Sequence, residues 1–499
     1  MLMSLQIPFS NAYATLPENF FRRETPTAIK SPVLQKFNNA LAAELGFDVE
    51  GISDDELAEV FGGNRIPAGA DPLAMAYSGH QFGNLNPTLG DGRAILLGDL
   101  IDSHGQRRDI QLKGAGTTAF SRMGDGRSPL GPAMREYILC EAMNALGVPS
   151  TRALALVSTG EKVVRDRLEP GAVFTRVAAS HIRVGTFQFL ALNGDAEGLK
   201  VLANHVLERH YPDIDTNADD CYVQLFRAIC QRQAALIARW MNLGFIHGVM
   251  NTDNMTISGE TIDYGPCAFM DTYHAAQVFS SIDRQGRYAY QNQPAIGQWN
   301  LARLAEPMLS LFDSDQKEAI AKASAVLKEY PDMYESAWRD GFNRKLGFSE
   351  TAGTDQPPRQ QLLDILERGE IDFTLFFRRL SHLPVTQNRE PVLKLITVFQ
   401  GDSVRNELNE WLDQWLAQLT EQAIEPDQAT QLMKQNNPAV IPRNHRVAEA
   451  IKAAEGGDYS VFENLLKALK KPYEELAEFE DYQKPPQPEE AVIRTFCGT

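Results

Sequence analysis

The 499-residue sequence contains no run of about twenty apolar residues, the length that a membrane-spanning helix needs. Its opening residues, MLMSLQIPFSNAYATLPENF, lack the basic-then-apolar order of an export signal. Basic residues are outnumbered, 48 against 65 acidic ones, which gives a formal net charge of -17. A surface of that sign on average repels nucleic-acid phosphates. We therefore expect a cytoplasmic, monomeric protein that binds neither membranes nor nucleic acid.

Cysteines are few, and none is placed as metal ligands usually are. The five residues, Cys140, Cys221, Cys230, Cys267 and Cys497, form no CxxC motif and no Cys/His cluster. We therefore expect neither a structural zinc site nor a disulfide framework. Four of them lie in apolar or mixed surroundings that favour buried thiols. Cys497 lies close to the end of the chain, where an exposed, reactive thiol is expected.

Sequence periodicity predicts a sheet-bearing region followed by a helical one. No segment of twenty to fifty residues repeats, which argues against a solenoid or propeller. Short β-runs bounded by turn signals are predicted at 93–100, 107–113, 151–157, 161–168 and 172–178. One helix is predicted between them at 132–146, with Gly147 as its stop.

Beyond about residue 185 the pattern is mostly helical. A long helix is predicted to end at Gly244, and further helices are predicted at 298–309, 314–330, 336–347, 359–369 and 463–471. Residues 350–361 are expected to form a linker, and the acidic, proline-bearing stretch 470–491 to be extended or mobile. Together these predictions give an α+β protein with a large helical C-terminal region.

Four residues around the predicted sheet suggest phosphate chemistry. Gly90 and Gly92 directly precede a β-run, where backbone N–H groups can approach a phosphate or sugar. A tight hairpin entry explains these glycines equally well. Lys113 ends the next strand, and Glu136 lies in the following helix. A lysine on a sheet that meets a glutamate on a packed helix is oriented to reach a phosphate.

The segment from Phe245 to Pro266 carries a second signal. Asn254 and Asp263 lie nine residues apart around the turn SGE, with MTI and TID as short β-runs. A hairpin would bring its two ends to roughly 5 Å, so the amide and carboxylate oxygens would converge. Such a pair of oxygen donors suits Mg²⁺. Either residue alone is equally well explained as a turn cap.

In this order the motifs resemble those of protein kinases, with DYG at 263–265 in place of DFG. One position departs from the kinase pattern: Val249 stands where the catalytic aspartate is expected, and valine cannot accept a proton. Asp253, directly before Asn254, is the nearest carboxylate.

This combination closely resembles the SelO family, also called selenoprotein O or YdiU, along most of the chain. The strings that carry the resemblance are SGHQFGNLNPTLGDGR, QLKGAGTTAFSRMGDGRSPLGPAMREY, HGVMNTDNM and DYGPCAFMD. The family has a kinase fold, binds ATP in a flipped orientation and transfers AMP to protein hydroxyl groups. The resemblance implies an N-terminal extension at 1–85, kinase-like lobes at 86–185 and 186–345, and a helical extension at 346–499.

The resemblance also implies roles for individual residues. Gly90, Gly92, Arg93, Asp125 and Gly126 would contact ATP; Lys113, Arg176 and Arg183 would hold its terminal phosphates; Glu136 would support Lys113; Asn254 and Asp263 would bind Mg²⁺ or Mn²⁺ beside ATP; and Asp253 would accept the proton. Some relatives carry selenocysteine near the C-terminus, so Cys497 is a candidate for a redox role, with Cys267 as a candidate partner.

Three functions are weighed on these residues. The first is a protein adenylyltransferase that modifies Ser, Thr or Tyr, with UTP as a further candidate donor. The second is an ordinary phosphotransferase, against which Val249 speaks. The third is a catalytically silent nucleotide-binding scaffold, against which the joint presence of Lys113, Glu136, Asn254 and Asp263 speaks.

Overall fold

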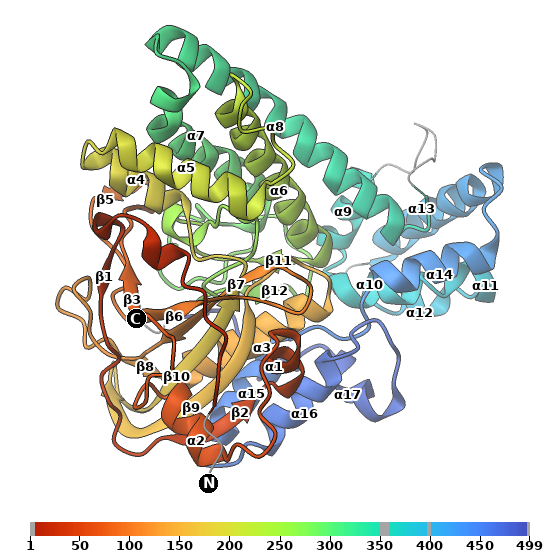
Figure 1. The fold of residues 1–499 in the computed structure, drawn as a ribbon. Helices are drawn as coiled ribbons and strands as arrows, with labels where there is room; N and C mark the ends of the chain where they lie inside the picture. Colours follow the sequence, from red (N-terminus) through yellow and green to blue (C-terminus); the bar gives the residue numbers. More distant parts are fainter. Residues whose placement is uncertain (1–4, 350–358, 397–400, 497–499) are drawn as a thin grey trace.

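The computed structural model describes residues 5–349, 359–396 and 401–496, and it shows a mixed α/β protein with a helical C-terminal region (Figure 1). Its main sheet has eight strands with antiparallel neighbours. In spatial order these are β1 (Phe21–Arg23), β3 (Leu73–Met75), β6 (Ala94–Ile101), β7 (Arg107–Lys113), β10 (Leu168–Ala178), β9 (Arg152–Val164) and β2 (Val33–Phe37), with β8 (Ser128–Pro129) paired to β10.

The strands predicted at 151–157 and 161–168 are one strand, β9, so the predicted break between them is wrong. Gly160 adopts a positive φ of 70°, yet the strand continues through it. The reason is pairing with β10 on both sides of the glycine, from Val163 opposite Glu169 to Ser158 opposite Ala172. A register shift between Pro170 and Ala172 absorbs the irregularity.

The two faces of the sheet have different partners. Ile110 and Leu112 of β7 join the core formed with α1 (Asn39–Glu44) and α2 (Asp54–Phe61). Residues alternate along a strand, so Gln111 and Lys113 point to the opposite face, where α3 (Leu130–Ala145) packs. The first 85 residues thus supply both strands and covering helices to the sheet region.

A second region is helical and lies above the sheet in Figure 1. It comprises α4 (Val184–Leu192), α5 (Ala196–His210), α6 (Cys221–Leu243), α7 (Gln293–Phe312) and α8 (Gln316–Lys345). The predicted stop at Gly244 is confirmed, because this residue caps α6 with a left-handed φ of 71°.

The helices predicted at 314–330 and 336–347 are a single helix, α8, which continues through Pro331. Proline has no N–H, so the carbonyl of Leu327 loses its helical donor. The side-chain amide of Gln298 on α7 donates to that carbonyl at 2.9 Å. A contact from another helix therefore replaces the backbone hydrogen bond that Pro331 cannot donate.

The C-terminal region contains α9 (Arg359–Arg368), α10 (Phe373–Leu380), α11 (Leu383–Thr386), α12 (Glu390–Leu393), α13 (Gly401–Glu421), α14 (Pro426–Asn436), α15 (Asn444–Glu455) and α16 (Ser460–Leu469). Residues 359–361 of the predicted linker belong to α9, and the rest of it lies outside the described residues. The stretch 470–491 is not simply extended, because it forms a 3₁₀ turn (Ala477–Phe479) and α17 (Glu480–Gln483). Its aromatic side chains Tyr473, Phe479 and Tyr482 pack on the neighbouring core, which accounts for this order.

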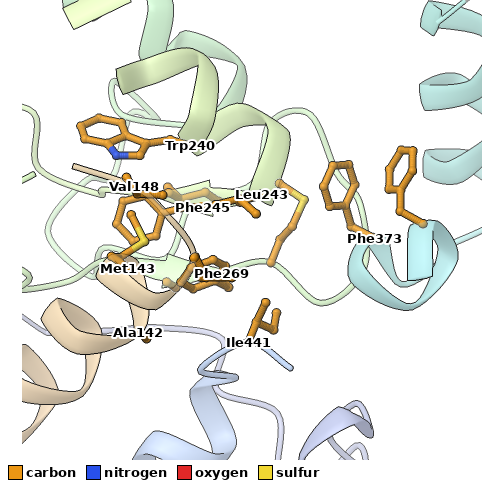
Figure 2. Packing of buried hydrophobic residues seen from close by; sticks show 14 of the residues in the cluster. Ala142, Met143, Val148, Trp240, Leu243, Phe245, Phe269, Phe373 and Ile441 are labelled. Atoms are coloured by element: carbon orange, nitrogen blue, oxygen red, sulfur yellow. The ribbon is translucent and has the colours of Figure 1, made fainter. Parts of the chain in front are cut away.

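Helix α3 is held by both the helical region and the C-terminal region. Figure 2 shows Ala142 and Met143 at the end of α3 in one hydrophobic cluster with Trp240 of α6, Phe269 of β12 (Ala268–Phe269) and Ile441. On its other side α3 packs against α15 and α16. Among the described helices, none combines the length and apolarity needed to cross a membrane.

Candidate active site

The α3 face of the sheet gathers charged side chains that are mostly buried. The strand register places Arg176 of β10 opposite Gln111 of β7, next to the pair of Phe174 and Lys113. Lys113 Nζ donates to Glu136 Oε2 of α3 at 2.6 Å. Arg176 donates through Nη1 to Glu136 Oε1 at 3.2 Å and through Nε to Gln111 Oε1 at 2.8 Å. The predicted pairing of Lys113 with Glu136 is present.

Asp263 of the DYG motif joins these cations from the helical region. Its Oδ1 accepts from Lys113 Nζ at 2.7 Å and from Arg176 Nη1 at 2.6 Å, and its Oδ2 lies 3.3 Å from Arg183 Nη1. Burial opposes ionisation, but Arg176, Lys113 and Arg183 outweigh it and hold the pKa of this carboxyl well below its usual range. Asp263 is therefore an anion shared by three cations.

A sixth charged residue, Asp91, was not predicted from the sequence. It lies between the two glycines of the turn before β6 and accepts from the Met75 backbone N–H at 3.1 Å and from Gln111 Nε2 at 2.9 Å. Its Oδ1 is 4.0 Å from Arg183 Nη2. We call Asp91, Lys113, Glu136, Arg176, Arg183 and Asp263 the ion-pair cluster. With three cations and three carboxyl groups, the ionised cluster is formally neutral.

The glycine turn has a packing reason for its glycines. Gly90 has a φ of 64°, and a Cβ there would lie 2.2 Å from the Phe120 ring. A Cβ on Gly92 would lie 2.9 Å from the Phe120 carbonyl oxygen. Gly126, with a φ of 67°, presses against the backbone of Gly116. The first two contacts hold the 114–127 loop against the glycine turn, and the third packs that loop on itself, so packing alone requires residues without a Cβ at these positions.

Asp125 is not part of the ion-pair cluster. Its carboxylate pairs with Arg165 at 2.8 Å, and its side chain is 45% exposed. The hydrogen bond from Arg165 lowers the pKa of Asp125, and burial, which acts in the opposite direction, offsets this only in part. A nucleotide contact of Asp125 thus stays a prediction, as does that of Arg93.

The loop from His247 to Asn254 brings Asp253 beside the cluster. Arg183 Nη1, which contacts Asp263, also donates to the Asp253 backbone carbonyl at 2.8 Å. Asn254 Nδ2 donates to the Val249 carbonyl at 3.0 Å, which fixes the orientation of the amide. Val249, at the position of the missing aspartate, is buried.

The Asp253 carboxyl group is buried and under-satisfied. Its Oδ2 lies 3.5 Å from Gln81 Nε2 at the end of β4 (Gly79–Gln81), and its Oδ1 has no hydrogen-bond partner in the described part of the chain. A Cβ on Gly79 would approach Oδ1 to 2.3 Å, so the carboxyl fills the space beside this glycine. Burial raises the pKa of Asp253 to about 6.

The prediction of a β-hairpin between Asn254 and Asp263 is wrong, because the two β-runs do not pair with each other. Thr256 bridges to Arg183 and Thr261 bridges to Ser150, rather than to each other. The turn is closed instead by Thr256 Oγ1, which donates to the Glu260 carbonyl at 2.7 Å. The segments carrying Asp253 and Asp263 are nevertheless close, because one nitrogen of Arg183 contacts both.

The donor set fits a divalent cation of the hard, oxygen-seeking kind. Asp263 is held ionised, and the Asn254 amide is turned by its bond to Val249 so that its oxygen remains available. No group of three or more His, Cys, Asp and Glu side chains within 5–349, 359–396 and 401–496 forms a metal-binding cluster. Mg²⁺ in nucleotide sites takes only one or two protein ligands beside phosphates and water, so a two-residue site is consistent with it.

The four described cysteines, Cys140, Cys221, Cys230 and Cys267, are buried and free, as predicted. Burial raises the pKa of the Cys267 thiol to about 11, so the thiol is unreactive in this state. Cys497 lies outside the described residues. Thr495, two positions before it, donates its hydroxyl to the carbonyl of Pro266, the neighbour of Cys267. The redox role of these two cysteines stays a prediction.

Comparisons with known proteins agree with this chemistry. Residues 3–470 match the family described as "Protein adenylyltransferase SelO". A protein of Rhizobium johnstonii named "Protein nucleotidyltransferase YdiU" is 55% identical over 99% of this chain and 97% of its own length. Proteins of the same name from Rhizobium meliloti and a Bradyrhizobium strain are 54% and 52% identical, over 98% and 100% of this chain and 99% and 100% of their own lengths. The chain therefore belongs to the SelO family.

Proposed function

We propose that this chain transfers AMP from ATP to Ser, Thr or Tyr hydroxyl groups of proteins and releases pyrophosphate, in a kinase-like fold. The observation that carries the proposal is the placement of charge. Lys113, Arg176 and Arg183 converge on one buried point, while the only carboxyl group of the 247–254 loop is Asp253 rather than the residue at Val249. Family membership supports a nucleotidyl transfer of this type.

The buried cations determine which phosphate leaves. Arg176 and Arg183 are each 2% exposed, so anionic oxygens that reach them lie deep in the protein. If the β- and γ-phosphates bind there, the charge that develops on departing pyrophosphate is stabilised by fixed guanidinium and ammonium groups. The α-phosphate then lies nearer the surface, where a hydroxyl of another protein can attack it in line.

Asn254 and Asp263 would hold the Mg²⁺ or Mn²⁺ ion. When bound, such an ion neutralises phosphate charge and orients the phosphates. Glu136 keeps Lys113 and Arg176 in place through bonds of 2.6 and 3.2 Å. Gly90, Gly92, Arg93, Asp125 and Gly126 would contact the nucleotide from the glycine turn and the 114–127 loop, as the family resemblance implies.

Asp253 would take the proton of the attacking hydroxyl. A carboxylate with an ordinary pKa is a weak base, whereas burial raises the pKa of Asp253 to about 6, closer to neutral pH. Its Oδ1, which has no hydrogen-bond partner among the described residues, would accept a hydrogen bond from the substrate hydroxyl. Val249 cannot perform this role, so ordinary phosphotransfer from the kinase position has no base.

Labelled nucleotide tests this proposal. The protein is incubated with Mg²⁺, a mixture of candidate protein substrates and ATP labelled on either the α- or the γ-phosphate. We expect protein-bound label from the α-position only. Label from the γ-position would indicate a kinase, and no label from either would indicate a nucleotide-binding scaffold. Asp263→Ala should abolish metal-dependent transfer and Lys113→Ala should weaken it severely; unchanged transfer by Asp263→Ala would contradict the metal assignment.

A further inference from the structure

Three side chains form a stacked cationic group outside the ion-pair cluster. Trp299 and Arg303 lie one turn apart on α7, and Arg287 lies in the loop before it. The guanidinium carbon of Arg287 is 4.8 Å from the centroid of the Trp299 ring, and that of Arg303 is 5.0 Å from it. All three side chains are partly exposed. We call Arg287, Trp299 and Arg303 the arginine–tryptophan surface.

This surface borders the loop that carries Asp253. The His80 ring packs edge-on against Trp299, with 5.4 Å between centroids. The His80 backbone N–H donates to Thr252 Oγ1 at 2.7 Å, and Thr252 directly precedes Asp253. From the other side, Tyr288, next to Arg287, donates its hydroxyl to Asn251 Oδ1 at 2.6 Å. Two successive contacts, from Trp299 to His80 and from His80 to Thr252, therefore link this surface to the residue next to Asp253, the candidate base.

The two guanidinium groups of this surface differ in their partners. Arg303 pairs with Glu306 at 2.6 Å, but the Glu306 side chain is 52% exposed. Arg287 forms no ion pair with a described carboxylate, and its Nε is buried without a hydrogen-bond partner among the described residues. The nearby Asp283 carboxylate is occupied by the backbone N–H groups of Arg287 and Tyr288, at 3.0 and 2.7 Å. The Arg287 guanidinium is thus left without a carboxylate partner among the described residues, and it can bind an anionic ligand.

Burial and the positive charges of Arg303 and Arg287 affect the pKa of the neighbouring His80. Burial, followed by the charge of Arg303 and, to a smaller degree, Arg287, lowers the pKa of His80. His80 Nδ1 lies 2.9 Å from Gln188 Nε2, and a neutral imidazole can accept a hydrogen bond from this amide. The imidazole therefore adds no charge at neutral pH, and the two guanidinium groups are the cations of this surface.

The arrangement favours carboxylate ligands. A guanidinium stacked on an aromatic face is held in place while its edge N–H groups remain directed outward, and that edge matches a carboxylate in a bidentate manner. We infer that the arginine–tryptophan surface docks an acidic segment of the protein substrate, with Asp or Glu side chains flanking the hydroxyl presented to Asp253. This inference rests on the proposed function, whose substrate class it narrows.

Two matched peptides test the inference. Each contains one Ser, one Thr and one Tyr, and they differ only in carrying Glu or Gln at the flanking positions. Binding to the full-length protein is followed by fluorescence anisotropy, and modification by transfer of label from α-labelled ATP with Mg²⁺. We expect the Glu peptide to bind more tightly, with about a five-fold loss for Arg287→Gln and for Arg303→Gln, the size typical of a partly exposed ion pair.

Arg284→Gln is the matched control, because Arg284 is exposed on the same loop but lies outside the stack. Its peptide affinity should stay within two-fold, and ATP affinity and unfolding temperature should be unchanged in all three variants. The preference should also decrease with added salt. Equal binding of both peptides, or an equal loss in Arg284→Gln, would overturn the inference. Preferential binding of the Glu peptide without α-label transfer would support the docking surface and contradict the proposed function.

Discussion

Asp263→Asn should increase the affinity for ATP when no divalent metal is present. The Asp263 carboxylate accepts hydrogen bonds from Lys113 and Arg176 at 2.7 and 2.6 Å and contacts Arg183 at 3.3 Å. A triphosphate that binds there must compete with it for the same donors. The substitution keeps the shape of the side chain but changes the formal charge of the ion-pair cluster from zero to plus one.

The size of the effect follows from these contacts. A hydrogen bond to a charged group contributes roughly 1.5–3 kcal/mol. Counting one such bond, at about 2 kcal/mol, as released to the phosphates gives about a thirty-fold gain in metal-free affinity. Calorimetric titration of ATP into chelator-treated protein measures it. Added Mg²⁺ should tighten binding to the parent protein and have little effect on Asp263→Asn.

A matched variant separates this competition from general disturbance. Asp109, on the same strand as Lys113, is also buried and pairs with Arg209 and His181. Asp109→Asn should destabilise the protein as Asp263→Asn does, by about 3–5 kcal/mol for a broken buried pair, without a gain in ATP affinity. An Asp263→Asn protein that is folded by thermal melting but binds metal-free ATP no more tightly than the parent would refute the competition.

Three further changes have defined outcomes. Lys345 is buried against the rings of Phe377 and Phe373, and burial lowers its pKa to about 7. Below pH 7 Lys345 is charged in the folded protein, so burial of the charge destabilises the fold in full, and this penalty fades as pH rises from 7 towards 10.5. The shift corresponds to about 5 kcal/mol, of which the ring contacts return about 2, so Lys345→Met should raise the melting temperature by about 3 °C at pH 6 and by little at pH 10; no difference between the two pH values would contradict this. Gly79→Ala should displace the Asp253 carboxyl and reduce α-label transfer by about a hundred-fold while ATP affinity, measured by titration, stays within two-fold. Phe462→Ala should remove the ring contact to Tyr137 of α3, at 5.7 Å, lower the melting temperature and slow transfer; a loss of stability without slower transfer would show that α3 does not need this support.

Local sequence patterns predicted the elements whose hydrogen bonds and packing are local. The stop of α6 at Gly244 is such a case, because a left-handed cap depends on the residue itself. The break expected at Pro331 did not occur, because Gln298 from another helix supplies the missing donor. The break expected within β9 did not occur, because β10 pairs with it on both sides of Gly160. Contacts between distant segments decided both cases, and no local window contains them.

The same distinction applies to the candidate site. Lys113 and Glu136 could be paired from sequence because each lies on an element with a clear pattern, and the resemblance to a known family added Arg176 and Arg183. Asp91 was missed, because it lies between two glycines whose spacing already had an explanation as a turn. Its hydrogen bonds to Gln111 and to the Met75 backbone depend on strand order, which periodicity does not give.

The position of α3 between α15, α16 and the rest of the protein limits how activity can be controlled. Arg135 on this helix donates to the backbone carbonyls of Gly265 and Cys267, two and four residues after Asp263, and to Asn444 of α15 at 3.3 Å. In kinases, an outward swing of the helix that carries the glutamate separates it from the lysine and switches the enzyme off. Here such a swing would have to break contacts with two other parts of the chain at once. We therefore expect α3 to keep its position, and a shortened chain that ends before residue 444 to lose the contacts from α15 and α16 that hold the helix carrying Glu136.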